Sequence, residues 1–247
     1  MYWRAENADA WREMWADVQS AGHGYGLDLP DLTPPEEIAG PWTEHWLRDD
    51  LILSQTCSMP LRTTLRHQVT YVGTFDFGLG GPPGQYWSHF VTREAGAPIQ
   101  NLAINGYDSQ SGYVAGLEPL VGQADTTAFA HHASDIMVTG SHRASLRAVA
   151  RNDADGAYID AVTLKLCDRF DPHLSHVERA GRTPPTPGLP LITAKGTDPE
   201  PLRAILRAAF AKGSWRGAPE LGGLQDFVVL DAEDYLSLPR PPGPTPH

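Results

Sequence analysis

The chain has 247 residues, of which 41% are hydrophobic and 20% are charged, and its formal net charge at pH 7 is -11. These proportions are typical of a globular protein and argue against a disordered chain. The acidity disfavours a nucleic-acid partner, which requires a basic face, whereas a small anion responds to the local field rather than to the net charge.

The two cysteines, Cys57 and Cys167, belong to no CxxC pair and to no Cys/His array, so neither a zinc site nor a disulfide framework is expected. No apolar run approaches the ~20 residues that span a bilayer. The first residues, MYWRAENADAWREMW, lack the basic head and the apolar stretch of a secretory signal. They predict a cytoplasmic protein as encoded, or a periplasmic one if the start site is misassigned.

The first part of the chain predicts one amphipathic helix followed by strands. Apolar side chains recur at helical spacing between residues 8 and 18 and predict a helix there. Residues 22–45 are rich in glycine, proline and acids and predict a loop, with a short helix at 35–39. Strands are predicted at 50–56 (DLILSQT), 68–75 (QVTYVGTF) and 86–94 (YWSHFVTRE), and a helix at 57–66.

The middle of the chain repeats a strand followed by a helix. The pattern predicts strands at 101–105, 134–140 and 155–161, and helices at 113–120, 143–152 and 162–170. Such alternation is typical of βαβ units, so we expect an α/β fold with mostly parallel sheets. The remaining pattern predicts a strand at 191–195, a helix at 198–211, a short final element at 225–238 and a disordered tail at 239–247.

Polar residues follow several of these strands. Ser54 to Thr56, Asp108 to Gly112 and Gly140 to His142 each lie between a strand and the next predicted helix, and Asp160 ends a strand. In open parallel sheets ligands bind beyond the carboxyl ends of the strands, where helix N-termini attract anions. Each of these hydroxyl or carboxylate residues is also explained as a helix N-cap, and His142 as an ordinary packed residue. The coincidence of four polar strand ends favours a shared binding cleft.

Motifs of known catalytic centres are missing from the sequence. It contains no GxSxG elbow, no Walker loop and no GxGxxG. The pair His131-His132 has no acid or histidine at metal-ligand spacing and is expected in a surface loop. We therefore expect neither a metal nor a cofactor.

Five blocks of the sequence resemble one family. LILSQTCSMPL, QYWSHFVTRE, AINGYDSQSGY, VTGSHRASLRAVARNDADGAYIDAVT and RTPPTPGLPLIT together resemble the PhnD-like phosphate/phosphonate substrate-binding proteins of ABC transporters. The resemblance runs from about Leu51 to Phe210. It implies a two-lobed class II periplasmic-binding-protein-like fold with a ligand cleft between the lobes. Lobe I would comprise residues 1–93 and 191–247, and lobe II residues 94–190, with crossing segments near 91–95 and 189–194. Members usually have a strand before the position of Met1-Tyr2, so the first strand of lobe I is expected to be missing here.

The resemblance also implies a set of ligand-binding residues. Ser109, Ser111 and Gly112 would meet an anionic head group at a helix start, flanked by Gln110 and Tyr113. Ser54, Gln55 and Thr56 would approach from the other lobe, with Tyr86 as an aromatic wall. His142 would help to hold the oxyanion, and Asp160 would meet a cationic substituent.

The leading expectation is a monomeric solute-binding protein for a small oxyanion such as phosphate or a phosphonate, which closes on its ligand and serves an ABC transporter permease. The predicted set holds no Lys or Arg, and Asp108 and Asp160 would repel a doubly charged anion, so zwitterionic and neutral ligands stay open. Two other functions stay open as well. One is an enzyme on the same fold with His142 and Asp160 as an acid-base pair, and the other is a cytoplasmic sensor read by a protein partner.

Overall fold

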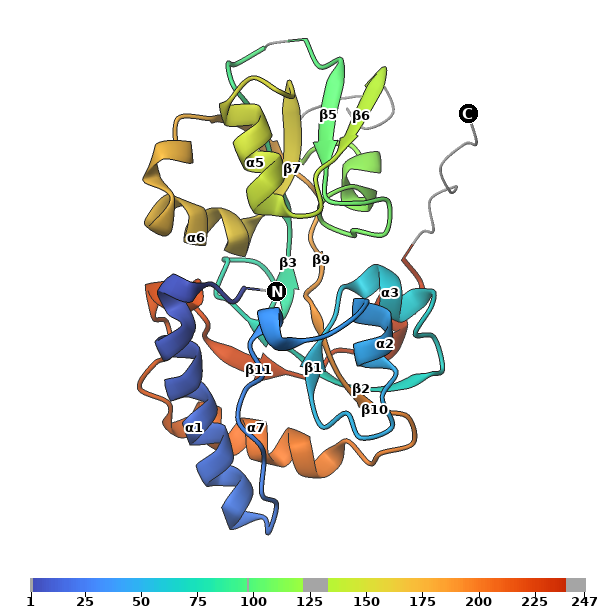
Figure 1. Ribbon diagram of the computed structural model, residues 1–247, viewed down its shortest axis with the longest axis vertical. Coiled ribbons are helices and arrows are strands. Elements are labelled where there is room, and N and C mark those ends of the chain that lie inside the picture. The colour runs from blue at the N-terminus through green and yellow to red at the C-terminus, as the bar shows by residue number, and fades with distance from the viewer. Residues whose placement is uncertain (1, 97, 122–132, 239–247) are drawn as a thin grey trace. The chain divides into compact units, whose positions relative to one another are not determined.

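The computed structural model describes residues 2–96, 98–121 and 133–238. The chain divides into two compact units (Figure 1): unit 1 is formed by Met1–Gln85 with Pro187–Ser237, and unit 2 is built on Tyr86–Thr186. The chain thus leaves and re-enters unit 1 before the predicted boundaries near residues 93 and 191, because the strand at 88–92 pairs on both edges within unit 2. The expectations for His131-His132 and for the tail at 239–247 lie outside the described residues.

Unit 1 is an α/β unit whose sheet is antiparallel. Its strands follow the order β1-β10-β2-β11, with every neighbouring pair antiparallel, and its helices are α1, α2, α3, α7 and α8 (Figure 1). The strands are β1 (Ser54–Gln55), β2 (Val69–Asp76), β10 (Pro190–Ala194) and β11 (Asp226–Val228). The helices are α1 (Ala8–Gly24), α2 (Trp42–Trp46), α3 (Ser58–Arg62), α7 (Glu200–Lys212) and α8 (Ala232–Leu236), with a 3-10 turn at Pro35–Glu37.

The apolar stripe of α1 explains how this helix joins unit 1. Trp11, Met14, Trp15 and Val18 are all buried, as their helical spacing predicts. The Trp15 indole N–H donates to the carbonyl of Pro30 at 2.8 Å, which ties the following loop to the helix. Helices α1 and α7 pack against each other, so both cover the same part of unit 1 (Figure 1).

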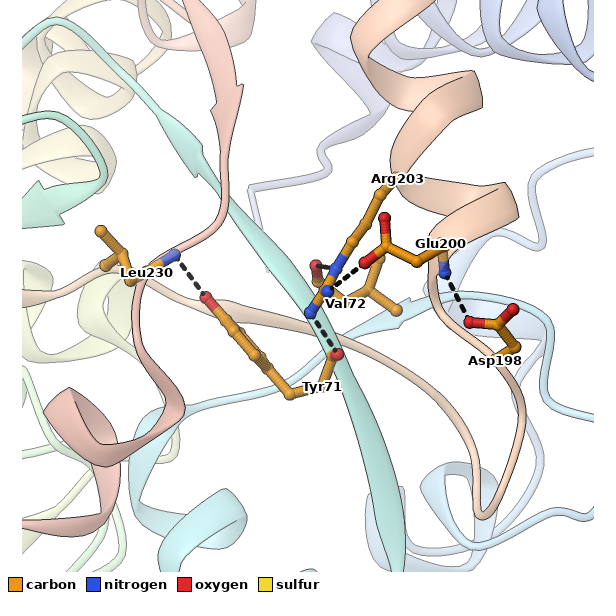
Figure 2. A network of polar contacts seen from close by, with 6 residues as sticks. All are labelled: Tyr71, Val72, Asp198, Glu200, Arg203 and Leu230. Carbon is orange, nitrogen blue, oxygen red and sulfur yellow. Dashed lines mark hydrogen bonds and ion pairs between the residues drawn. The ribbon is translucent and has the colours of Figure 1, made fainter.

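An arginine of α7 forms hydrogen bonds to the sheet of unit 1. Figure 2 shows Arg203 reaching from α7 to β2, where its guanidinium donates to the carbonyl of Val72 at 2.8 Å and to that of Tyr71 at 3.2 Å. The same guanidinium pairs with Glu200 at 2.6 Å. Because β11 pairs only with Thr74–Asp76 of β2, these two carbonyls lie beyond the end of that ladder. Arg203 therefore supplies donors next to the point where the β2–β11 ladder stops.

Unit 2 has a mixed sheet with the order β6-β5-β7-β4-β8. Strands β5 (Asn101–Ile104), β6 (Asp135–Val138) and β7 (Gly156–Asp160) are parallel, whereas β4 (Ser88–Thr92) runs antiparallel to β7 and to β8 (Glu178–Arg182). The helices are α5 (His142–Ala150) and α6 (Ala161–Phe170), with 3-10 turns at Val114–Leu117 and Pro172–Leu174. Strand β3 (Gln85–Tyr86) pairs with β9 (Thr186–Pro187) in a separate ribbon.

The pleat of the sheet sorts the core of unit 2 into two clusters. Ala157 and Ile159 of β7 join the cluster that includes α5 and α6, whereas Tyr158, between them in sequence, joins the cluster on the other face. Val91 and Phe90 of β4 divide in the same way. Because β7 is buried along its whole length, both faces of the sheet are covered at its centre.

The α/β class and the alternation of strands and helices are confirmed, but fewer strands pair in parallel than predicted. In the sheet of unit 2 parallel pairing is confined to β6-β5-β7, because β4 lies between β7 and β8 and runs antiparallel to both. The strand predicted at 86–94 is interrupted at Trp87 and forms β3 and β4. Strand β8 was not predicted, since its sequence ERAGR has no apolar alternation.

Two predicted helices are shorter in the structure. The helix predicted at 113–120 is only a 3-10 turn at Val114–Leu117, which is followed closely by Pro119. The helix predicted at 57–66 ends at Arg62, where the Thr63 hydroxyl donates to the carbonyl of Met59 at 2.8 Å. Helix α2, in a segment predicted as loop, is a single turn that buries Trp46.

Replacing Arg203 by alanine should destabilise unit 1. The change removes two charge-assisted hydrogen bonds to backbone carbonyls, so we expect a loss of about 2–3 kcal/mol in the free energy of unfolding, measured by urea denaturation. Arg207→Ala, an exposed position of the same helix with the same change in charge, should alter it by less than about 0.5 kcal/mol. Equal losses in the two variants would contradict this role of Arg203.

Candidate functional site

A polar cluster lies at the ends of the parallel strands of unit 2. The turn after β5 carries Ser109 to Tyr113, α5 begins at His142, and β7 ends at Asp160. Because β5 is a parallel neighbour of β7, the residues that follow one strand lie beside those that end the other. Ser111, His142 and Asp160, predicted from separate segments, are thereby brought together.

Ser111 and His142 are joined by a short hydrogen bond. The Ser111 Oγ lies 2.8 Å from His142 Nε2, and His142 Nδ1 lies 3.1 Å from the carbonyl oxygen of Tyr158. Nδ1 also lies 3.4 Å from the backbone N–H of Asp160. A carbonyl only accepts, so the shorter of these two contacts, that with Tyr158, favours the tautomer with the ring proton on Nδ1. In a neutral ring Nε2 then accepts from the Ser111 hydroxyl, whose lone pairs remain for other donors.

Burial lowers the pKa of the His142 imidazole, against the opposing effect of the nearby Asp160 carboxylate and of the bond to Tyr158. The ring is therefore neutral at pH 7. Asp160, which is 1% exposed, accepts from the backbone N–H of Thr163 at 2.8 Å and caps the N-terminus of α6. Its carboxylate thus has a structural task besides the predicted contact with a ligand.

The turn from Asn105 to Tyr113 is tightly built. The Ser109 Oγ accepts from the backbone N–H of Gly112 at 3.0 Å within the turn, but it caps no helix, because the 3-10 turn that follows has Tyr113 at its N-cap position and no side-chain cap. A Cβ on Gly112 would lie 2.6 Å from Cγ of Asn105, so only glycine fits this position. The Ser88 hydroxyl donates to the carbonyl of Ser111 at 2.8 Å and holds the turn to β4.

Of the other predicted residues of unit 2, Gln110 and Tyr113 lie on the same turn, whereas Tyr86 lies in β3. Gln110 is 3% exposed, and its carbonyl accepts from the backbone N–H of Ala115 at 2.8 Å. Tyr113 is half-buried and packs edge-to-face on Tyr107, with ring centroids 5.2 Å apart. Burial raises the pKa of its phenol. Tyr86 is buried in β3.

The predicted residues Ser54, Gln55 and Thr56 belong to unit 1. The Ser54 Oγ lies 3.3 Å from Nε2 of His45, and the buried Gln55 Nε2 has no hydrogen-bond partner among the described residues. Thr56 is fully buried, and its hydroxyl donates to the carbonyl of Cys57 at 3.5 Å. Ser54 thus makes only a long hydrogen bond within the protein, and the side-chain amide nitrogen of Gln55 makes none among the described residues.

Three residues next to these positions were not predicted. His45 lies beside Ser54, Ser88 holds the turn that carries Ser111, and Asn105 packs its side chain on Gly112. Asn105 opens the polar turn, so its place at the end of a strand was an available clue. His45 lies nine residues before Ser54 and Ser88 lies 23 residues before Ser111, and no local pattern indicates these contacts.

The chemistry of the cluster suits binding through hydrogen bonds. It contributes hydroxyls, an imidazole and the backbone N–H groups at the start of α5, a helix of nine residues. In the part of the chain that the structure describes, no group of three or more His, Cys, Asp or Glu residues could hold a metal ion. Nor does that part contain a helix of the length and apolar character that crossing a membrane requires.

Gly112→Ala should distort the turn that carries Ser111. The new methyl group would meet the Asn105 side chain and the Ser109 hydroxyl at less than 3 Å, so we expect a loss of about 1–3 kcal/mol in the free energy of unfolding. Gly24→Ala is the control, because a Cβ there meets nothing within 4 Å. Wild-type stability of the Gly112 variant, measured by urea unfolding, would show that the turn has room for a side chain.

His142 should make stability depend on pH. Because burial lowers its pKa in the folded chain, the unfolded chain binds the proton more readily, and stability falls as pH drops below the ordinary imidazole pKa of about 6.5. In His142→Gln this contribution is absent. The difference in unfolding free energy between the variant and the wild type should therefore be smaller at pH 5 than at pH 7.5. His45 and His89, whose pKa values burial also lowers, are common to both proteins and cancel. A difference that does not change with pH would contradict the prediction.

Comparisons with solved structures give the fold. The chain is similar to a binding protein component of an ABC phosphonate transporter from Pseudomonas aeruginosa, with 14% identity, a TM-score of 0.64, and 93% of this chain and 80% of that chain covered. It is also similar to PhnD1 from Prochlorococcus marinus in complex with methylphosphonate, with 11% identity, a TM-score of 0.63, and 93% and 90% covered. It is similar as well to XAC2383 from Xanthomonas citri bound to ATP, with 17% identity, a TM-score of 0.61, and 92% of this chain and 90% of that chain covered. These likenesses show the periplasmic-binding-protein fold.

A comparison with models of protein families assigns the chain to a family. No curated protein sequence matches the chain. The family described as "ABC transporter, phosphonate, periplasmic substrate-binding protein" matches residues 83–235, which is more than half of the chain and includes the turn of Ser111, the start of α5 at His142 and the end of β7. The chain therefore belongs to the family of periplasmic substrate-binding proteins of phosphonate ABC transporters.

Proposed function

We propose that this chain binds small molecules that carry a phosphonate or phosphate group and delivers them to an ABC transporter permease. The head group would meet Ser111 and His142 of unit 2 and Ser54 and Gln55 of unit 1, and the two units would close on it. The observation that carries the proposal is the 2.8 Å bond between Ser111 and His142, at the ends of parallel strands in a chain of this family.

The protonation of His142 supports a head group that brings its own proton. With a neutral ring the Ser111 hydroxyl donates to Nε2 and offers lone pairs to the ligand, so it suits a singly protonated phosphonate. A fully ionised phosphonate would require the opposite order, in which a protonated Nε2 donates to Ser111 and the hydroxyl donates onward. Either way the predicted set relies on hydrogen bonds, since it includes no Lys or Arg.

The other predicted residues take supporting roles in this proposal. Ser109, Gln110 and Gly112 would shape the turn and present its backbone N–H groups, and Tyr113 and Tyr86 would flank the ligand. Asp160 would meet a positively charged substituent while it caps α6. Thr56 would act through its backbone, whose N–H donates to the carbonyl of Pro190 at 3.0 Å and fixes the course of the segment.

The ligands of similar proteins agree with an anionic head group. PhnD1 was solved with methylphosphonate, and XAC2383 with chloride and with ATP. The family description places its members in the periplasm, and we propose the same location for this chain, as a monomer that has no nucleic-acid partner.

Calorimetric titration with methylphosphonate tests the proposal. We expect saturable binding by the wild type, and a loss of affinity of about tenfold or more in Ser111→Ala and in His142→Ala, because the first change removes a hydrogen bond to the charged head group and the second removes the partner that orients the Ser111 hydroxyl. Ser175→Ala is the matched control, since this exposed serine of unit 2 bonds only to the carbonyl of Pro172 among the contacts described.

Two results would overturn this function. The first is the absence of binding to methylphosphonate and to inorganic phosphate in a wild-type protein shown to be folded by its cooperative thermal unfolding. The second is conversion of the bound compound, followed by phosphorus NMR during prolonged incubation, which would indicate an enzyme in which His142 and Asp160 act as an acid-base pair. Unchanged phosphorus signals with saturable binding would support a receptor.

A further inference from the structure

Unit 1 contains a cavity of about 740 Å³, most of whose lining has no role in the proposed function. It lies between α1, the loop around residues 30–39 and the segment that leads into β1, and all of its lining residues belong to unit 1. Trp11, Met14 and Trp15 line it from the buried face of α1, and Ile38 and Trp42 line it from the segment 38–42. Its lining is therefore largely apolar and aromatic.

One end of this cavity coincides with the predicted contact segment of unit 1. Ser54 and Gln55 line it, together with His45, whose Nε2 lies 3.3 Å from the Ser54 Oγ. A head group bound at Ser54 would thus have open space beside it within the same unit. The polar end and the apolar body together form a pocket with two chemical halves, as pockets for organic molecules usually do.

The size of the cavity is too large for a simple oxyanion. At ~30 Å³ per water molecule, its volume corresponds to roughly 25 waters, and pockets for organic ligands measure about 300–1,000 Å³. Inorganic phosphate or methylphosphonate would displace only a few of those waters and would leave the side chain of Trp42, which is 47% exposed, in contact with water. A larger apolar substituent would replace that water with aromatic contacts, which is favourable.

The charges around the cavity restrict the substituent further. The lining includes the carboxylates of Asp31, Glu37, Glu44 and Asp50 and one guanidinium, that of Arg48. Arg48 is already paired with Asp50 through bonds of 2.7 and 2.8 Å. Burial and the charge of Arg48 lower the pKa of His45, so its ring adds no positive charge at pH 7. The lining thus carries more negative than positive groups, all of them exposed, which disfavours a second acidic group on the ligand.

We propose that this cavity holds the organic substituent of the ligand, and that the substrate class of the chain is a phosphonate with a bulky, apolar or aromatic substituent that is uncharged or positively charged. The inference rests on the proposed function, because it requires a phosphonate head group at Ser54. It separates this chain from a receptor for inorganic phosphate or for methylphosphonate alone.

Calorimetry of the full chain with three probes tests the inference: methylphosphonate, benzylphosphonate and 4-(phosphonomethyl)benzoate. Benzylphosphonate should bind at least about tenfold more tightly than methylphosphonate, and the added carboxylate of the third probe should remove this gain. Methylphosphonate is the reference because it presents the head group without a substituent that reaches the tryptophans.

A variant that fills the cavity provides the second arm. Ala39 is exposed and lines the cavity, so Ala39→Trp adds bulk there without entering the core. It should weaken benzylphosphonate at least about fivefold and leave methylphosphonate within about twofold. Ala211→Trp is the matched control, because Ala211 is an exposed alanine of α7 that is not among the residues lining the cavity, and it should change neither affinity.

The outcomes separate the two proposals. Equal affinity for methylphosphonate and benzylphosphonate, or an equal loss of both in Ala39→Trp, would overturn the inference and leave the proposed function standing. The absence of binding to any of the three probes would overturn the proposed function, and the inference with it. Tighter binding of benzylphosphonate that Ala39→Trp removes selectively would support both.

Discussion

The pairing of β10 on both of its edges is the interaction on which unit 1 depends. This strand follows the whole of unit 2 in sequence, yet it lies between β1 and β2, and all five of its residues are buried. Its register sets Ser54 opposite Ile192 and Gln55 opposite Leu191. The segment proposed to meet the ligand in unit 1 therefore takes its position from the part of the chain that has returned from unit 2. The cavity beside that segment depends on the same pairing, because Leu191 also lines it.

The elements that the sequence predicts well are those in which several local preferences agree. Helix α6 combines a stripe of apolar residues with an aspartate cap, and β7 is an apolar run long enough to cross a core. Strand β8 has a charged, glycine-containing sequence and forms only because β4 offers it a free edge. The turn at Val114–Leu117 has helical periodicity, but Pro119 and the approach of the Tyr158 ring to Gly116 leave no room for a regular helix. Tertiary contacts decide these cases, and local patterns contain no information about them.

The candidate site shows the same division. Sequence reasoning predicts that residues after neighbouring parallel strands gather at one edge, and Ser111, His142 and Asp160 do so in unit 2. It does not predict which of them bond to each other, because the 2.8 Å contact of Ser111 with His142 depends on how the turn is held by Ser88. Nor does a pattern of polar residues predict that the Thr56 side chain is buried. Residue types at strand ends thus indicate where a ligand can bind, whereas hydrogen-bond partners determine which atoms remain for it.

The insertion of unit 2 between the two halves of unit 1 has a consequence for synthesis on the ribosome. Unit 2 is built on one continuous segment, and its strands are complete once Arg182 has emerged. The first half of unit 1 is made earlier, but β1 and β2 have no strand between them until β10 follows, and β11 comes later still. At a synthesis rate of ~5–20 residues per second, α7 is made about ten seconds or more after α1, and until then the apolar face of α1 has no α7 to pack against. The chain can therefore complete the sheet of unit 2 before that of unit 1, although its synthesis begins with unit 1.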